Sequence, residues 1–315
     1  MYEKLPQYVL ASKADSTRQK YRYAFNAWCK WSKLHNFPSF PASHVHIALY
    51  LIHLSETQKS TSKIDEAIYA ISWAHKLASL MDPCKSQFLK SVREGAHKKI
   101  GHITVKKEPI SAEILIKIVD KYGQNSSNLK DLRIACMCLL SYAGFLRFSE
   151  LANLKRSNIH FYSDYIKLNL EKSKTDVYRE GRDVLISKTG NTTCPVSMLA
   201  RYLKLADIPE NSDEFVFRSV SYCSSNNTYK LRKNCTLSYS RAREILLCAL
   251  EDLGYDKKLF GLHSLRSGGA SAAAAAGIED RLFKKHGRWK SENAKDGNVK
   301  EDVNQRLSVS KSLGI

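Results

Sequence analysis

The 315-residue sequence lacks a long apolar run, a secretory leader and paired cysteines. The longest apolar run, 134–146, contains small and polar residues and is too short to cross a bilayer. No leader-like apolar stretch opens the chain, so we expect a reducing compartment. The absence of Cys-x-x-Cys pairs and His clusters argues against a zinc site or a disulfide framework. The cysteines are therefore expected to be buried thiols: Cys29, Cys84, Cys136, Cys138, Cys194, Cys223, Cys235 and Cys248.

Acidic side chains are scarce beside basic ones. The chain has 50 Lys and Arg against 31 Asp and Glu, which gives a net charge of +19. The excess is found in both halves of the chain. Residues 1–109 have 17 basic and 8 acidic side chains, and residues 110–315 have 33 basic and 23 acidic ones. Such a field favours a polyanionic partner, although a basic surface that only keeps the chain soluble is the alternative. The 43% hydrophobic content excludes a disordered chain.

The length predicts two domains, each with its own core. The first, 1–100, is predicted to be a bundle of four short helices. The first helix has N-capping candidates in Asp15, Ser16 and Thr17, and the others are expected to begin near Ser43, Ser60 and Ser86. The apolar spacing predicts that Val45, Leu49 and Ile52 form the buried stripe of the second helix.

Residues 101–110 break the helical pattern with a glycine, a basic pair and a proline, and we interpret them as a linker. The second domain, 111–315, is predicted to be mainly helical, with a hairpin formed by 165–170 and 182–186. Further helices are expected over 129–142, 195–205, 240–253, 264–276 and 278–285, and a strand-like stretch over 214–217. The predicted fold class is therefore mainly α with a small antiparallel β-sheet (α+β).

Small residues mark two further places in the second domain. Gly144 follows the long apolar helix and is expected to let the chain change direction sharply. The alanine run at 272–276 is expected to pack closely against another helix, because alanine lets backbones approach.

Two groups of residues in the second domain, each with a basic side chain, have spacings that would let their side chains act together in an active site. Arg147 follows a helix end and precedes Glu150 by three residues, so the carboxylate can buttress the guanidinium. His263 and Arg266 have the same spacing at a helix start, which puts both on one face beside free backbone N–H groups.

Lysines at the hairpin tip and a tryptophan near the C-terminus are further candidates for the same site. Lys172 and Lys174 lie between the two predicted strands, and Trp289 ends a Gly-Arg-Trp sequence. Each feature alone has an ordinary explanation, such as a structural ion pair or a solvated lysine. Their order along the chain is more specific. We expect the following five residues to converge around one oxyanion: Arg147, Lys174, His263, Arg266 and Trp289.

In this order of residues the sequence resembles the tyrosine recombinase (phage integrase) superfamily, both its XerC/XerD-like and its eukaryotic transposon-type members. The resemblance implies a catalytic domain over 111–315 and a helical core-binding domain over 1–100, arranged as a C-shaped clamp around duplex DNA. It implies double-stranded DNA as the partner, assembly of several copies on DNA, and residence in the nucleus. No cofactor, membrane or small-molecule substrate is expected.

The resemblance also implies catalytic roles. Arg147 and Arg266 would grip the nonbridging oxygens of the scissile phosphate, which suits bidentate guanidinium groups. Lys174 would protonate the leaving 5′ oxygen, and His263 would assist proton transfer or orient the phosphate. The combination would serve phosphoryl transfer, in which negative charge spreads over oxygen atoms.

The nucleophile is where the sequence departs from the family. Trp289 would donate its indole N–H to the same phosphate, and Glu150 would hold the site together. The family places a nucleophilic tyrosine nine residues beyond the Trp position, where this sequence has Asn298, and no tyrosine follows Tyr255. A carboxamide has no ionisable oxygen with which to attack phosphorus.

Three accounts of Asn298 remain open. The chain is a relative that binds DNA without cutting it, a variant copy of an active recombinase, or a protomer that receives its tyrosine from another chain. A copy of this same chain cannot supply that tyrosine. A different class of function is a protein-interaction module in which Trp28 and Trp31 form a partner surface, although packing inside the bundle is the plainer interpretation.

Contacts to DNA outside the catalytic residues are expected from basic side chains in both domains: Arg18, Arg22, Lys106, Lys107 and Lys172. The C-terminal segment 303–313 is expected to pack either within its own chain or, as in the family, on a neighbouring copy.

Overall fold

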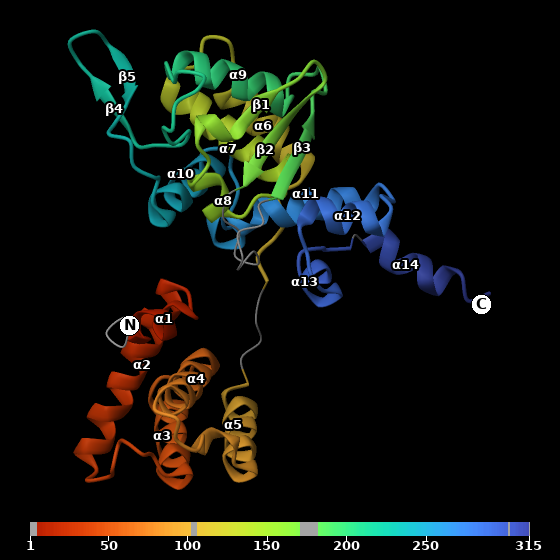
Figure 1. Cartoon of the computed structure of the whole chain (residues 1–315). Coiled ribbons are helices and arrows are strands. Elements are labelled where there is room, and N and C mark those ends of the chain that lie inside the picture. The colour runs from red at the N-terminus through yellow and green to blue at the C-terminus, as the bar shows by residue number, and fades with distance from the viewer. Residues whose placement is uncertain (1–4, 102–105, 171–181, 302, 315) are drawn as a thin grey trace. The chain divides into compact units, whose positions relative to one another are not determined.

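Helices make up most of the computed structural model, which describes residues 5–101, 106–170, 182–301 and 303–314. The chain divides into two compact units, Met1–Val105 and Lys106–Ile315, named here the N-terminal and C-terminal units. The boundary between them falls inside the segment predicted as a linker, 101–110. The predicted fold class, mainly helical with a small antiparallel sheet, is confirmed (Figure 1).

The N-terminal unit is a helical bundle. Its elements are α1 (Leu5–Ala11), α2 (Asp15–Leu34), α3 (His44–Thr57), α4 (Thr61–Leu77), the 3-10 turn η2 (Pro83–Lys85) and α5 (Gln87–Ile100). All but α1 and η2 were predicted from the apolar spacing and the caps. Trp28 of α2 is fully buried, donates its Nε1–H to the Ser39 carbonyl at 2.9 Å, and stacks on Trp31. The aromatic face of α2 is therefore part of the core.

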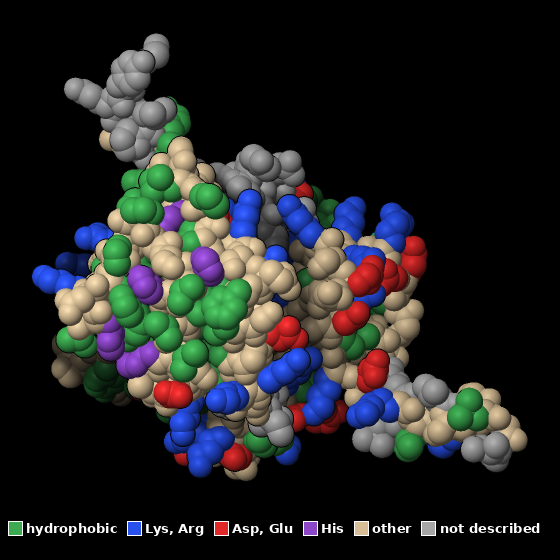
Figure 2. Space-filling view, turned by 90° about the horizontal axis from the view of Figure 1, so that it is seen from below, with side chains coloured by type: hydrophobic (Ala, Val, Ile, Leu, Met, Phe, Trp, Pro, Cys, Tyr) green, Lys and Arg blue, Asp and Glu red, His purple; other side chains and the backbone are tan. Residues whose placement is uncertain are grey.

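The outer face of α3 corrects the predicted buried stripe. Val45, Leu49 and Ile52 are 44–45% exposed, whereas Ile47 and Leu51 are fully buried. Because α3 is apolar on nearly every side, its periodicity could not identify which side packs inward. Figure 2 shows exposed apolar side chains and histidines gathered on one face of this unit.

The central helix of the C-terminal unit is α7 (Leu129–Ala143), which is buried along most of its length and packs against α6, α9 and α11. The other helical elements are α6 (Ala112–Tyr122), α8 (Phe148–Ala152), η3 (Arg156–Asn158), α9 (Pro195–Leu205), α10 (Tyr239–Glu251), η4 (Lys257–Leu259), α11 (His263–Ala275), α12 (Asp280–Gly287), α13 (Glu292–Asp296) and α14 (Val303–Lys311). Among the described helices, none has both the length and the apolar content needed to span a membrane.

Two antiparallel sheets complete the C-terminal unit. The first consists of β1 (Ile159–Phe161), β2 (Tyr165–Leu170) and β3 (Arg182–Ser187) in that order. Its register pairs Tyr165 with Ser187 and Leu170 with Arg182, which confirms the predicted pairing of these segments. The second sheet is a hairpin of β4 (Val220–Cys223) and β5 (Thr228–Leu231) that projects from the body of the unit (Figure 1).

The strand predicted over 214–217 is wrong. Phe215 makes only an isolated bridge with Lys155, while Val216 and Phe217 are fully buried in the core. The backbone around this bridge is paired with residues 154–156, through Arg156 N–H to the Glu214 carbonyl at 3.0 Å and Val216 N–H to the Leu154 carbonyl at 2.9 Å, and this pairing is too short to form a strand. The short strands β1, β4 and β5 were not predicted, because three or four residues give too little alternation to detect.

The turn after α7 is made by Phe145 instead of Gly144. Phe145 has a φ of 44°, in the left-handed region, whereas Gly144 has a φ of −93°. Space at 144 is tight, because a Cβ there would lie 3.1 Å from the Leu140 carbonyl oxygen. A non-glycine residue in the left-handed region costs about 1–3 kcal/mol and persists where its surroundings fix it. This fixed loop leads directly into Arg147.

Close packing of α11 comes from glycines and not from the predicted alanine run. A Cβ on Gly268 would lie 2.0 Å from the Ile110 carbonyl oxygen, and one on Gly269 would lie 2.2 Å from that of Tyr142. The alanines at 272–276 are half-buried or exposed. The glycine pair therefore sets how closely α11 approaches the core.

The cysteines only partly match the expectation of buried thiols. All eight are free. Cys136, Cys138 and Cys194 are buried, but Cys235 and Cys248 are exposed. Residue type predicts burial only as an average, and these two side chains lie on the outer sides of a loop and a helix.

Candidate active site

Arg147 and Glu150 form the first part of the site, at the start of α8. The Glu150 carboxylate accepts from the Arg147 backbone N–H at 2.9 Å and from the Arg147 Nη1 at 2.8 Å. The Glu150 side chain is completely buried, while that of Arg147 keeps 19% exposure. The pair therefore presents a cation, and not its carboxylate, to the solvent.

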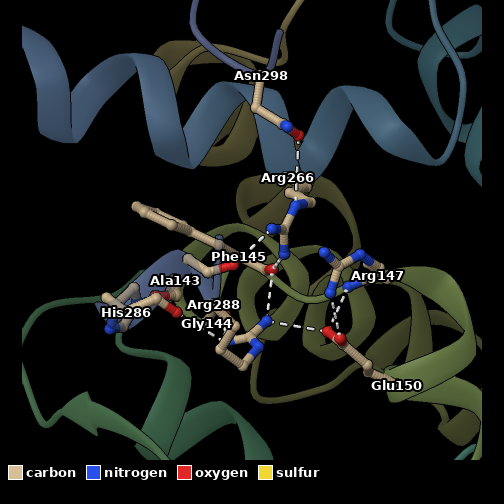
Figure 3. A network of polar contacts seen from close by, with 10 residues as sticks. Ala143, Gly144, Phe145, Arg147, Glu150, Arg266, His286, Arg288 and Asn298 are labelled. Carbon is tan, nitrogen blue, oxygen red and sulfur yellow. Dashed lines mark hydrogen bonds and ion pairs between the residues drawn. The ribbon is translucent and has the colours of Figure 1, made fainter. Parts of the chain in front are cut away.

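Arg288 binds the same carboxylate from a distant part of the chain (Figure 3). It is 1% exposed, its Nη2 lies 2.9 Å from Glu150 Oε2, and it also donates to the carbonyls of Phe145 at 2.8 Å and Gly144 at 3.1 Å. Burial alone would raise the pKa of Glu150, but the charge of Arg288 and the charge and hydrogen bonds of Arg147 outweigh it and lower the pKa. Sequence reasoning missed Arg288, whose only signal was its place in Gly-Arg-Trp.

Arg266 reaches the same loop from α11. It is 1% exposed and donates to the carbonyl of Phe145 and, at 2.6 Å, to that of Gly287. Burial, and then the charges of Arg147 and Arg288, lower the pKa of Arg266 below its ordinary value. An anion beside Arg266 would favour its charged form and so offset the cost of desolvation and of the repulsion between cations.

Asn298 lies against Arg266, where the resemblance places the nucleophile. Its Oδ1 accepts from Arg266 Nε at 3.3 Å (Figure 3). Its Nδ2 donates to the Ala294 carbonyl at 2.6 Å. The side chain of His263, the first residue of α11, also contacts Asn298. Desolvation of the His263 ring, and then the charges of Arg266 and Arg147, lower the pKa of His263 despite the Asn298 contact.

Ion pairs tie α13, which precedes Asn298, to α12. Lys295 Nζ lies 2.5 Å from an Asp280 carboxylate oxygen of α12 and 2.7 Å from one of Glu292. Lys284 of α12 also pairs with Asp280, at 3.0 Å. The Lys295 side chain is only 17% exposed, so these contacts hold the segment that ends at position 298 against its own chain.

Trp289 closes the apolar side of the site. It is 7% exposed, and the Arg266 guanidinium lies 4.9 Å from the centre of its ring. Its indole Nε1 is buried and finds no hydrogen-bond partner among the described residues. His286, which sequence reasoning also missed, bonds to the Ala143 carbonyl at 2.8 Å and joins α12 to the loop after α7.

The arrangement is suited to an oxyanion. The structure brings together six of the residues singled out from the sequence: Arg147, Glu150, His263, Arg266, Trp289 and Asn298. Two guanidinium groups bind one carboxylate and the charge of a third, Arg266, acts on the same group, so positive charge remains in excess. Guanidinium donors match the geometry of phosphate oxygens. Within the described ranges, no cluster of His, Cys, Asp and Glu is arranged to hold a metal ion.

Residues 111–295, more than half of the chain, match the model of the phage integrase family. The chain belongs to this family. The curated relatives of this integrase-family chain include an integrase/recombinase XerD homolog of Selenomonas ruminantium. The two are 26% identical over 300 residues, which cover 92% of this chain and 84% of the relative.

Solved structures share the integrase-family fold at low sequence identity. The Tn1549 transposon integrase, in complex with transposon right end DNA, has a TM-score of 0.64 at 12% identity, covering 96% of this chain and 95% of that one. A lambda integrase tetramer bound to a Holliday junction has a TM-score of 0.58 at 16% identity, covering 95% of this chain and 77% of that one. These likenesses agree with the mainly helical α+β architecture described above.

Two lysines predicted for the integrase site lie in a segment that the structure does not describe. Lys172 and Lys174 fall between β2 and β3, outside the described residues. The strands on either side of them are paired, with Leu170 opposite Arg182. The role assigned to Lys174 therefore stays a prediction.

The other basic residues predicted to touch DNA lie at the surface. Arg22 of α2 is exposed, and Arg18 of the same helix is paired with Asp15. Lys106 and Lys107 are both exposed at the start of the C-terminal unit, where Lys107 donates to a backbone carbonyl of η4. Their contact with DNA stays a prediction.

Proposed function

We propose that this chain binds duplex DNA and seats one backbone phosphate between Arg147, Arg266 and His263. The observation that carries the proposal is the excess of guanidinium charge around the buried carboxylate of Glu150. A bound phosphate would offset the repulsion and desolvation that lower the pKa of Arg266. The similar recombinases and integrases, two of them bound to DNA in their solved structures, support the same substrate class.

We also propose that the chain does not cleave the DNA it binds. Cleavage by the tyrosine mechanism needs a hydroxyl group that can attack phosphorus. The carboxamide of Asn298 instead accepts a hydrogen bond from Arg266 and donates one to Ala294. The family carries out DNA recombination and integration. This chain would thus keep the residues that bind the phosphate in that chemistry and would lack the nucleophile.

Filter binding of a random-sequence duplex at increasing salt tests DNA binding. We expect the logarithm of the affinity to fall linearly with the logarithm of salt concentration, with a slope of about 0.9 for each phosphate neutralised. Arg147→Gln should bind more weakly at every salt concentration. Lys257→Gln, which removes an exposed cation of η4 that pairs with Glu251 of α10, is the matched control and should bind as the wild type does. A wild-type affinity that does not change with salt would refute the proposal.

Copies of the chain would assemble on DNA through α14. This helix extends from the body of the C-terminal unit (Figure 1) and is followed by Leu313, which is 65% exposed, while its own Leu307 is 45% exposed. A groove of about 1030 Å³ is lined by apolar side chains that include the exposed Ile116, Leu185 and Leu282. The exposed leucines of this segment in a second copy, Leu307 and Leu313, would suit this groove. Leu307→Ser should then abolish cooperative shifts on DNA gels while single-copy binding persists.

The proposal has three further parts. The chain would form a clamp around DNA, it would derive from a transposon, and it would act in the nucleus. Both units are basic, so both would contact one duplex, as the C-shaped clamp of the family requires. The order of site residues supports a transposon-derived chain that acts in the nucleus. Lys98, Lys99, Lys106 and Lys107 are exposed and suit an import signal. A fluorescent fusion that remains outside the nucleus would contradict this location.

A further inference from the structure

The β4–β5 hairpin is an ordered arm with a polar outer face. At its root, Val220, Tyr229 and Leu231 pack against the core of the C-terminal unit. The register places Ser221 opposite Lys230, on the other face of the ribbon, because side chains alternate along a strand. Anchoring at the root matters because an isolated two-stranded hairpin is marginally stable in water.

The charge of the hairpin is of one sign. No Asp or Glu occurs between Glu214 and Glu244 in the sequence. Lys230, Arg232 and Lys233 are all exposed on β5 and directly after it. The tip consists of exposed hydroxyl and amide side chains: Ser224, Ser225, Asn226, Asn227 and Thr228.

The tip is held in shape by its own side chains. Thr228 Oγ1 donates to Asn226 Oδ1 at 2.7 Å, and the Tyr222 hydroxyl donates to Asn227 Oδ1. Both carbonyl oxygens of the amides are thus engaged, which orients the two NH₂ groups of the tip. Amide groups of this kind are typical partners of base edges.

We propose that the β4–β5 hairpin is a second DNA-contacting element, which enters a groove of the duplex away from the phosphate seated at Arg147. The major groove accepts a two-stranded ribbon, and an acid-free ribbon with three exposed cations suits the phosphates that line it. The inference rests on the proposed function, since it needs the chain to bind DNA. It adds a contact that none of the residues around Glu150 provides.

A triple substitution in the full-length chain tests the hairpin. Lys230→Gln, Arg232→Gln and Lys233→Gln together should weaken binding of a random-sequence duplex and reduce the salt slope by about 0.9 for each phosphate that is no longer neutralised. The matched control replaces three exposed lysines of α6 and η4: Lys117→Gln, Lys121→Gln and Lys257→Gln. The control should keep the wild-type slope. If the hairpin and control variants have equal salt slopes while the wild type still binds DNA, the inference about the hairpin is overturned and the proposed function is not.

Crosslinking distinguishes direct contact from a general charge effect. A photoreactive benzoylphenylalanine in place of Asn226 should crosslink to DNA. In the control without DNA, no crosslinked band should form. A crosslink to a second copy of the chain, and none to DNA, would overturn the inference and make the hairpin a protein contact. A wild-type chain without salt-dependent binding would instead refute the proposed function, so the two failures are distinguishable.

Discussion

Glu150 is the residue on which the cations of the proposed phosphate site depend. Its carboxylate is completely buried and joins Arg147 to Arg288. Glu150→Gln would leave two guanidinium groups without their counter-charge, which costs about 3–5 kcal/mol when a buried pair is broken. We expect a loss of that order in the free energy of unfolding of the C-terminal unit, measured by denaturant titration. A loss below about 1 kcal/mol would contradict the assigned role.

The same carboxylate predicts how stability depends on pH. Since the pKa of Glu150 is lowered in the folded chain, its contribution is present above the ordinary carboxyl pKa and is lost as the pH falls through the lowered value. The wild type should therefore lose stability on acidification more steeply than Glu150→Gln. Parallel denaturant titrations at descending pH check this, and identical acid profiles would contradict it.

The sequence predicted the polar residues of the site better than the residues that hold them in place. Arg147 and Arg266 were found from order and spacing, because their chemistry requires particular residue types, and Asn298 was found from the position that the family resemblance gives to the nucleophile. Arg288 was missed, since a single buried arginine that binds backbone carbonyls leaves no periodic signal. Phe145 was missed for a similar reason, because a bulky residue with a positive φ is fixed by tertiary packing and not by local preference.

At the scale of elements, the approach of α11 to the core depends on Gly269. A Cβ there would lie 2.2 Å from the Tyr142 carbonyl oxygen, which belongs to a buried backbone and cannot easily move. Gly269→Ala should destabilise the C-terminal unit by about 1–3 kcal/mol, as overpacking does. Gly95→Ala in α5 is the control, since nothing lies within 4 Å of a Cβ at that position. The control should be neutral or stabilising in thermal unfolding, and equal effects would contradict the packing argument.

Helix α13 positions residue 298 through its ion pairs with α12. Lys295 contacts Asp280 and Glu292, so Lys295→Gln should loosen the segment that carries position 298. In an Asn298→Tyr background we expect this change to lower the yield of covalent protein–DNA adduct several-fold and to leave DNA affinity unchanged. Lys257→Gln in the same background is the control. An unchanged adduct yield would contradict a positioning role for Lys295.

Helices were predicted well where an amphipathic pattern and caps agreed, as in α9, whose bounds match the prediction. The buried face of α3 was predicted wrongly, because Val45 and Ile47 are both apolar and only the neighbouring helices decide which is covered. Short strands such as β4 depend on a partner strand, so the local sequence alone did not reveal them.

At the scale of the whole molecule, the proposed clamp would close over the segment that joins the two units. Lys106 and Lys107 are exposed there and are open to trypsin in the free chain. Bound duplex DNA should slow cleavage after these lysines several-fold, while cleavage after the exposed Lys311 near the C-terminus of α14 serves as the reference. Equal rates of cleavage at Lys106 and Lys107 with and without DNA would contradict closure around the duplex.

The most direct measurement is covalent capture on singly nicked duplexes with a randomised core, analysed on denaturing gels. The wild-type chain should bind these duplexes without forming an adduct, because position 298 offers no hydroxyl group. Asn298→Tyr should form the adduct, and adding Arg266→Gln should abolish it. An adduct from the wild-type chain, or none from an Asn298→Tyr chain that binds DNA as the wild type does, would contradict a phosphate site that is intact except for its nucleophile.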